Sequence, residues 1–176
     1  MPRNSDVGPD FRRIYVSIWD DPDFTAMSRR AQQLYFLLIS YRHTRSTGVL
    51  DWAPGRFEDF SSDADVEELK EDLSGLEDAG FIVADTKYAE VLIRTYMKHD
   101  YHLTNGNRAK GLASQFRFIK SPKIYEAILR QLGKQYAENP EMKCWEVFRA
   151  RLESDWPQIE AHAKQHQKTR ITEDNF

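Results

Sequence analysis

Residues able to bind a metal or to act as catalytic groups are few in this sequence. The densest group is "HDYH", in which His99, Asp100 and His102 offer two imidazoles and one carboxylate. A zinc site needs four ligands, usually completed by a second Cys or His pair at a defined spacing, and the sequence has no such pair. We therefore expect "HDYH" to be a polar linker, and we expect neither a metal nor a cofactor.

Other catalytic signatures are also missing from the sequence. It contains neither a phosphate-binding glycine loop nor a Gly-x-Ser-x-Gly nucleophile elbow. The single cysteine, Cys144, lies in "EMKCWEVF", whose amphipathic pattern predicts a buried helical residue rather than a nucleophile. These observations favour a protein that is not an enzyme.

The charges are distributed very unevenly along the chain, although its net charge is only −3. Residues 51–90 hold three basic and thirteen acidic residues, a net of −10, whereas residues 91–134 hold nine basic and two acidic residues, a net of +7. A basic block favours a polyanionic partner, and we expect double-stranded DNA. The predicted DNA contacts are Arg42, Arg45, Ser61, Ser62, Lys87, Arg94, Lys98, His99, Asn105, Asn107, Arg108, Lys110, Arg117, Lys120 and Lys123.

The acidic block leads to an alternative function. Residues 63–78 of this block are predicted to form a helix, and their carboxylates are expected to be exposed. These charges would oppose the entry of the helix into a DNA groove, since the Debye length at ordinary salt is about 8 Å. The chain would then be a protein-interaction module, or a mimic of DNA, that docks acidic side chains onto a basic partner. The predicted partner-binding residues are Glu67, Glu68, Glu71, Asp72 and Asp78.

The elements that must position these charges follow from apolar spacing and capping residues. In the first hundred residues we expect a short strand or extended arm, a helix capped by Ser28, a strand, a brief helix, a helix that ends at Gly80, and a hairpin. Three helices followed by a hairpin are the winged helix-turn-helix arrangement, in which the hairpin is the wing. The predicted boundaries are arm 14–19, strand 49–52, brief helix 56–60, a cap at Ser62 or Asp63 for the helix before Gly80, and hairpin strands 81–84 and 90–96.

Three more helices are predicted beyond residue 100. Thr104, Ser121 and Asn139 are their expected caps, and the last residues are expected to fray. The predicted class is therefore mainly α with a small β component (α+β). The predicted organisation is a flexible N-terminus over 1–11, a winged-helix domain over 12–100, a helical region over 101–166 and a frayed tail over 167–176.

The sequence also bears on location and assembly. No apolar run approaches the ~20 residues that cross a bilayer, and the N-terminus lacks the apolar core of a secretion signal. One cysteine is compatible with a reducing compartment, so we expect a cytoplasmic protein with no membrane partner. Whether the chain forms a homodimer is left open.

The order of several segments resembles that of a group of winged-helix proteins from actinobacteria and their phages. The resemblance covers about residues 12–133 and rests on "IYVSIWDDPDFTAMSRRAQQLYFLLIS", "GVLDW", "DVEELKEDLSGLEDAGFIV", "VLIRTYMKHD" and "SPKIYEAIL". Members are described as DNA-binding proteins, phage replication-initiation proteins or replisome organisers, with DnaD-like primosome components among their relatives.

This resemblance implies a non-catalytic DNA-binding protein that acts in replication initiation or its regulation and recruits a host or phage replication protein. The polar turn that follows the wing in the family corresponds to Lys98, His99 and Asp100. Winged helices generally contact DNA through the second helix and the wing. Here that helix is acidic and the wing offers only Lys87, so the basic segment after the wing is the expected contact.

Overall fold

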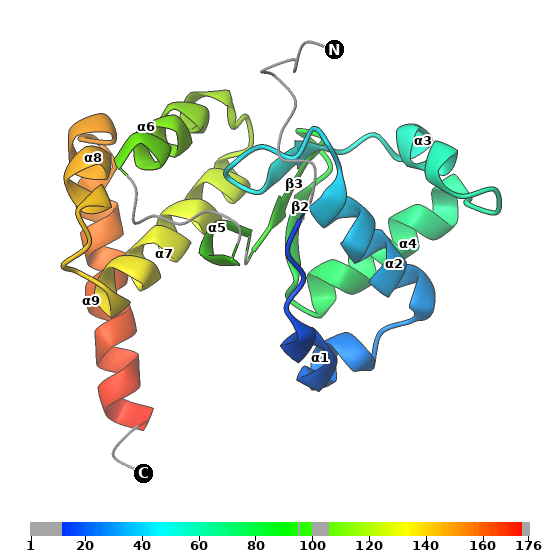
Figure 1. Cartoon of the computed structure of the whole chain (residues 1–176), viewed down its shortest axis with the longest axis horizontal. Coiled ribbons are helices and arrows are strands. Elements are labelled where there is room, and N and C mark those ends of the chain that lie inside the picture. Colours follow the sequence, from blue (N-terminus) through cyan, green and yellow to red (C-terminus); the bar gives the residue numbers. More distant parts are fainter. Residues whose placement is uncertain (1–11, 95, 100–105, 174–176) are drawn as a thin grey trace. The chain divides into compact units, whose positions relative to one another are not determined.

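The computed structural model describes residues 12–94, 96–99 and 106–173, without the side chains of 98, 99 and 170–173. The chain is mainly helical with one small antiparallel sheet, as the predicted α+β class requires (Figure 1). It divides into two compact units, residues 1–100 and residues 101–176. None of the helices within the described ranges combines the length and the apolar character that crossing a membrane requires.

Unit 1 combines short helices with a three-stranded sheet. The strand order is β1-β3-β2, and β3 pairs in antiparallel fashion with both neighbours, so that Leu50 and Ala84 lie opposite Val91. The elements in order are η1 (Val16–Asp20), α1 (Pro22–Thr25), α2 (Arg29–Ser40), β1 (Val49–Asp51), α3 (Pro54–Phe57), η2 (Glu58–Phe60), α4 (Val66–Asp78), β2 (Ile82–Asp85), β3 (Glu90–Ile93) and α5 (Tyr96–His99).

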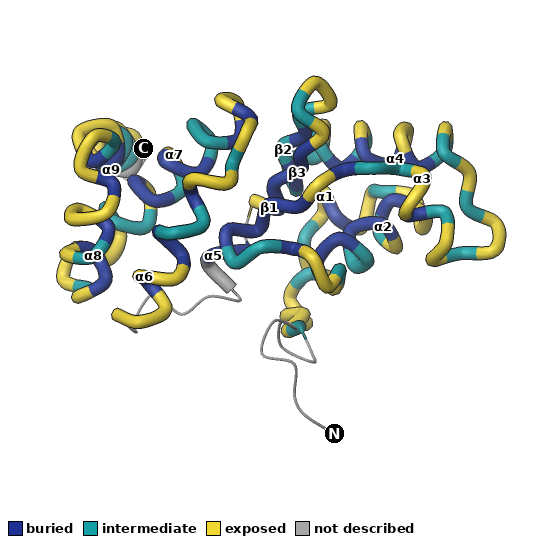
Figure 2. The backbone as a smooth tube through the Cα atoms, turned by 90° about the horizontal axis from the view of Figure 1, so that it is seen from above, coloured by how far each residue is buried: buried dark blue, intermediate teal, exposed yellow. Residues whose placement is uncertain are grey.

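The core of unit 1 forms where α2, α4 and the sheet meet. Helix α2 buries Leu34 and Leu38, and α4 buries Leu69, Leu73 and Leu76 in the same cluster. Each of these leucines contributes about 1.5–3 kcal/mol when it is fully buried. In Figure 2 the strands are buried along most of their length, whereas the helices alternate between buried and exposed residues. The periodic apolar residues of α2 and α4 therefore face the core, as their spacing predicted.

The predicted cap of α4 is wrong, whereas the predicted glycine after its last turn is confirmed. The side chain of Asp65 caps the helix by accepting the N–H groups of Glu67 at 2.9 Å and Glu68 at 3.2 Å, so the predicted cap at Ser62 or Asp63 is wrong. Asp63 is engaged elsewhere because the hydroxyl of Ser61 donates to it. At the other end Gly80 has φ +78°, the left-handed conformation that was predicted.

Two predicted strand boundaries in unit 1 are wrong. Residues 14–19 were predicted to be a strand or an extended arm, but only the start of this segment, at Tyr15, is extended. From Val16 the 3₁₀ helix η1 turns the chain, so that the Trp19 ring packs against Phe24 and Phe36, with ring centroids 5.5 and 6.1 Å apart. The last strand ends at Ile93 rather than at residue 96, because Tyr96 starts helix α5. The remaining elements of unit 1 lie within a few residues of their predicted positions.

In the described residues of unit 2, 106–173, the regular elements are all helices. They are α6 (Gly106–Gln115), η3 (Phe116–Phe118), α7 (Pro122–Glu138), α8 (Cys144–Arg151) and α9 (Trp156–Glu173). Helix α6 packs against α8, and α7 packs against α9. The predicted start of α7 is confirmed, since Ser121 Oγ accepts the N–H of Ile124 at 3.1 Å and Pro122 occupies the first turn.

Two other predictions for unit 2 are corrected. Helix α8 begins at Cys144 rather than after Asn139, whose carbonyl instead accepts the indole N–H of Trp145 at 2.7 Å. Fraying was predicted from residue 167, yet α9 continues to Glu173. Its helical conformation is supported by contact with α7, against which Ile159 is buried. The predicted cap Thr104 and the N-terminus 1–11 lie outside the described residues.

Candidate nucleic-acid interface

Residues 106–123 of unit 2, which we call the basic stretch, hold five Lys/Arg residues and no Asp or Glu. Helix α6 buries Ala109, Leu112 and Ala113, which leaves Arg108 and Lys110 exposed to solvent. Because the apolar stripe fixes the rotation of the helix, these two cations are held on its outer side. The other three, Arg117, Lys120 and Lys123, are exposed as well.

The turn η3 presents an aromatic ring among these cations. Phe116 is 2% exposed and lies edge-on to Tyr125, with ring centroids 5.9 Å apart, whereas Phe118 is 47% exposed. The guanidinium of Arg117 lies 4.7 Å from the centroid of the Phe118 ring, within the range of a cation–π interaction. One phenylalanine thus anchors the turn, and the other remains at the surface.

The start of α7 adds to the positive potential of the basic stretch. Lys120 and Lys123 flank the capping residue Ser121, and the first turn of α7 contains no acidic residue. The N-terminal end of a helix carries a partial positive charge, which reinforces these cations. Asn107, the remaining predicted contact on α6, is also exposed. The basic stretch can therefore neutralise several phosphates over a short length of chain.

The predicted DNA contacts in unit 1 are more dispersed. Arg45 is committed to the sheet, where its guanidinium lies 3.1 Å from Asp51 and 3.3 Å from Glu90, whose side chain is fully buried. Arg94 donates to the carbonyl of Gly80 at 2.8 Å. These two arginines have roles in the fold of unit 1.

Four further predicted contacts of unit 1 lie on loops. Arg42 and Ser62 are exposed, and the hydroxyl of Ser61 is bound to Asp63. Lys87, in the turn between β2 and β3, lies 5.5 Å from the ring centroid of Tyr88. Lys98 and His99 belong to α5, but their side chains, like Asn105, lie outside the described residues. Of the predicted DNA contacts that the structure describes, only those within residues 106–123 lie together on consecutive elements.

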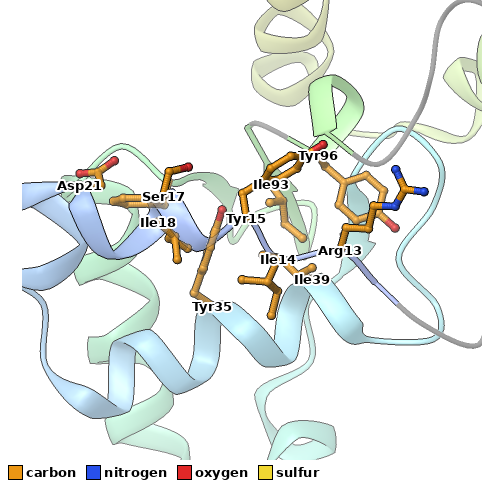
Figure 3. A pocket seen from close by; sticks show the side chains of 11 residues that line it. Arg13, Ile14, Tyr15, Ser17, Ile18, Asp21, Tyr35, Ile39, Ile93 and Tyr96 are labelled. Carbon is orange, nitrogen blue, oxygen red and sulfur yellow. The ribbon is translucent and has the colours of Figure 1, made fainter.

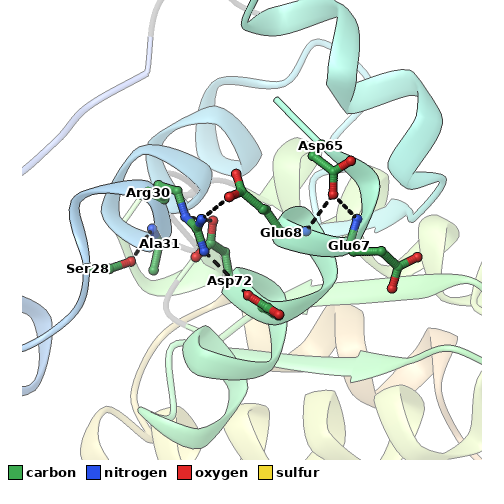
Figure 4. Close-up of polar contacts among 8 residues, drawn as sticks. Ser28, Arg30, Ala31, Asp65, Glu67, Glu68 and Asp72 are labelled. Atoms are coloured by element: carbon green, nitrogen blue, oxygen red, sulfur yellow. Dashed lines mark hydrogen bonds and ion pairs between the residues drawn. The ribbon is translucent and has the colours of Figure 1, made fainter. Parts of the chain in front are cut away.

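The acidic helix α4 is held by one arginine of α2. Arg30 lies 2.5 Å from Glu68, 3.5 Å from Glu71 and 3.4 Å from Asp72 (Figure 4). Desolvation opposes the protonated form, but the three carboxylates outweigh it and raise the pKa of Arg30. Asp72 was predicted to be exposed and is only 7% exposed, because it turns toward Arg30 and the neighbouring helix.

Other carboxylates of α4 also have partners within unit 1. Glu67 lies 2.6 Å from Lys70, and Glu77 accepts the backbone N–H of Ala84 at 3.0 Å. Asp65 caps the helix, as described above. Asp78 is exposed, with Glu67 and Glu71 on the same solvent-facing side. Much of the acidity of α4 therefore contributes to the fold.

A cavity of about 200 Å³ opens in unit 1 between the segment 13–18 and the core (Figure 3). Its inner wall is mainly apolar and includes Tyr35, Ile39 and Ile93. This volume is below the ~300–1,000 Å³ of typical small-molecule sites. Among the described residues, its charged lining side chains are Arg13 and Asp21.

Neither metal nor thiol chemistry finds support in the described part of the chain. Its His, Cys, Asp and Glu residues nowhere form a group of three that could hold a metal ion. Burial raises the pKa of Cys144 to about 11, so its thiol is protonated at neutral pH and is a weak nucleophile. The prediction that Cys144 is buried is confirmed.

Two features of these surfaces were missed from sequence. The ion pairs of Arg30 with α4 join residues about forty positions apart, and no local pattern indicates them. The exposure of Phe118 was not predicted, although an Arg-Phe pair in a basic segment is a signal that could have indicated it. No protein-family model, curated protein or solved structure matches the chain.

Proposed function

We propose that this chain is a non-catalytic DNA-binding protein whose basic stretch contacts the phosphates of duplex DNA. One observation carries the proposal: five exposed Lys/Arg residues and no carboxylate lie within residues 106–123, on elements whose opposite side is buried. Lysine and arginine that neutralise phosphates release counterions, and this release supplies most of the affinity of non-specific DNA binding.

Unit 1 has features that support a winged helix within this proposal. Helix α2, strand β1, the short helices α3 and η2, helix α4 and the hairpin β2–β3 follow in the required order, and β1 pairs with β3. In such a fold α4 would be the recognition helix and the hairpin the wing. Glu67, Glu71 and Asp78 on the exposed side of α4 would repel phosphates, so unit 1 contributes little direct affinity.

A role in replication initiation or its regulation is a further part of the proposal. It is supported by the resemblance of residues 12–133 to replication proteins of actinobacterial phages. A protein of this kind would bind DNA through one unit and bring a replication protein to it through another surface. The replication partner follows from the same resemblance. The expected compartment, the cytoplasm, is supported by the single cysteine.

The proposal is tested by titrating a fluorescent duplex of random sequence with the full chain and measuring anisotropy at low and moderate salt. The wild type should bind at low salt and lose affinity steeply as salt rises. The triple variant Arg108→Ala, Lys110→Ala, Lys120→Ala should bind roughly tenfold or more weakly and show a flatter dependence on salt.

A matched variant removes three exposed cations of unit 2 outside the basic stretch: Lys143→Ala, Arg151→Ala and Lys164→Ala. It changes the net charge by the same amount and should bind almost as the wild type does. Equal loss of affinity in both variants would mean that only total charge matters. Failure of the wild type to bind duplex at low salt would contradict DNA binding itself.

A further inference from the structure

Phe118 is an exposed ring within the positively charged part of unit 2. A side chain that exposes 47% of its surface gives up about half of the stabilisation that full burial of an aromatic ring provides. Its neighbour two positions earlier, Phe116, is buried and fills the core next to Phe148, at a centroid distance of 6.4 Å. The Phe118 ring therefore contributes less to the packing of the core than the Phe116 ring does.

The surroundings of Phe118 indicate the chemistry of a ligand. Arg117 holds its guanidinium 4.7 Å from the ring centroid, and Lys120 follows two residues later. Proteins that bind single-stranded nucleic acid combine aromatic rings, on which bases stack, with cations that follow the phosphates. In a duplex the bases are already stacked and paired, so a surface ring does not reach their faces.

We infer that Phe118 is a stacking platform for an unpaired base, so that the basic stretch takes single-stranded DNA in addition to contacting duplex phosphates. This inference rests on the proposed function, because the cations that attract the phosphates are the same. It adds a specific role for the ring: Phe118 contributes to the binding of unpaired DNA and not to the binding of duplex.

A second exposed phenylalanine shows that exposure alone is not the argument. Phe60, in η2 of unit 1, is 53% exposed, but its chain neighbours include Glu58, Asp59 and Asp63. Those carboxylates would repel a nucleic acid. Phe118 has only cations among the charged residues from 106 to 123, so the charges along its own segment are complementary to a polyanion. Phe60→Ala is therefore a matched control for Phe118→Ala.

The test measures the affinity of the full chain for an oligothymidylate and for a random duplex, at one salt concentration, by fluorescence anisotropy. Phe118→Ala should weaken binding to the oligothymidylate roughly tenfold and change duplex binding less than about twofold. Phe118→Trp should retain the affinity of the wild type, and Phe60→Ala should leave both affinities unchanged. Circular dichroism confirms that each variant is folded.

Base stacking on Phe118 can be detected separately, by the fluorescence of a base analogue. A single 2-aminopurine placed in the oligothymidylate should change its fluorescence when it binds the wild type and Phe118→Trp, and much less when it binds Phe118→Ala. This optical change depends on contact with the ring, which a purely structural role of Phe118 would not produce.

The outcomes separate this inference from the proposed function. Binding of the wild type to neither DNA overturns both. Binding to both DNAs with no loss in Phe118→Ala, or with equal loss on single strand and duplex, overturns the stacking role alone. Tighter binding to vesicles of phosphatidylserine and phosphatidylcholine than to either DNA, lost in Phe118→Ala, would also overturn it, since the ring would then insert into a lipid surface.

Discussion

Helix α4 and the basic stretch are both amphipathic and strongly charged, yet their charges have different uses. Both bury a stripe of small or apolar residues, represented by Leu73 in α4 and Leu112 in α6. The carboxylates of α4 face Arg30, Lys70 and a backbone N–H group of the same unit. The basic stretch contains no carboxylate at all over eighteen residues, 106–123. A run of like charges can therefore serve the fold, as in α4, and does not by itself indicate a partner.

Charge reversal should produce the largest difference between the two regions. Arg108→Glu with Lys110→Glu should lower duplex affinity on the order of 100-fold, because two attractive phosphate contacts become repulsive. The mirror change, Glu67→Lys with Asp78→Lys on α4, should leave the affinity unchanged or slightly increase it. Anisotropy titrations of the two double variants provide the measurement. Loss of binding in the α4 variant alone would assign the DNA contact to α4.

Two helical glycines allow a direct comparison of packing in the two units. A Cβ added to Gly133 in α7 would lie 2.5 Å from the Cβ of His162 and 2.8 Å from the carbonyl oxygen of Ile159, whereas a Cβ at Gly75 in α4 would meet nothing within 4 Å. Gly133→Ala should therefore destabilise the chain by about 1–3 kcal/mol. Gly75→Ala should stabilise it by up to about 1 kcal/mol.

Urea unfolding of the two glycine variants measures these changes, with the wild type as reference. Opposite signs are expected, since the two substitutions have the same helix propensity gain and differ only in the space around the new methyl group. A stabilising Gly133→Ala would show that α7 and α9 do not approach each other closely at this position.

Removal of Arg30 should affect stability and leave DNA binding unchanged. Arg30→Gln leaves Asp72, which is nearly buried, without its cation, so the melting temperature should fall by a few degrees. Lys70→Gln breaks an exposed ion pair with Glu67 and should have no detectable effect. Thermal unfolding followed by circular dichroism compares the two, and equal melting temperatures would contradict the structural role assigned to Arg30.

The smallest expected effect is a loss of stability at alkaline pH that arises in unit 2. Burial, with the hydrogen bond from Tyr125 to Asp155 at 2.7 Å, raises the pKa of Tyr125. An unfolded tyrosine titrates near pH 10, so above this pH the unfolded state loses its proton first and stability falls as pH rises. In Tyr125→Phe the fall in unfolding free energy between about pH 9 and pH 11 should be smaller. An identical fall in both proteins would assign it to other groups.

Much of the fold follows from local sequence signals. Ser28 and Ser121 cap the helices that they were predicted to cap, because each precedes a strongly periodic apolar run. Gly80 ends α4 as expected, and the hairpin follows directly. The cap of α4 was misplaced because several residues from Ser61 to Asp65 can accept a helical N–H, and only the turn between them decides which one does.

The charge of the candidate site could be predicted from the sequence, but the arrangement of its side chains could not. The basic block between residues 91 and 134 is evident from composition, since its net charge is +7. The burial of Asp72 against Arg30 and the use of Arg45 within the sheet depend on contacts between distant segments. The surface position of Phe118 depends on a turn of 3₁₀ helix, which apolar periodicity does not specify.

The dependence of duplex affinity on salt tests the central claim most directly. The logarithm of the association constant for the wild-type chain, plotted against the logarithm of salt concentration, has a slope of about −0.9 for each phosphate that is neutralised. If the five cations of the basic stretch each neutralise one phosphate, the slope is roughly −4 to −5. A flat dependence on salt, or no binding at low salt, would contradict a DNA-binding role for the basic stretch.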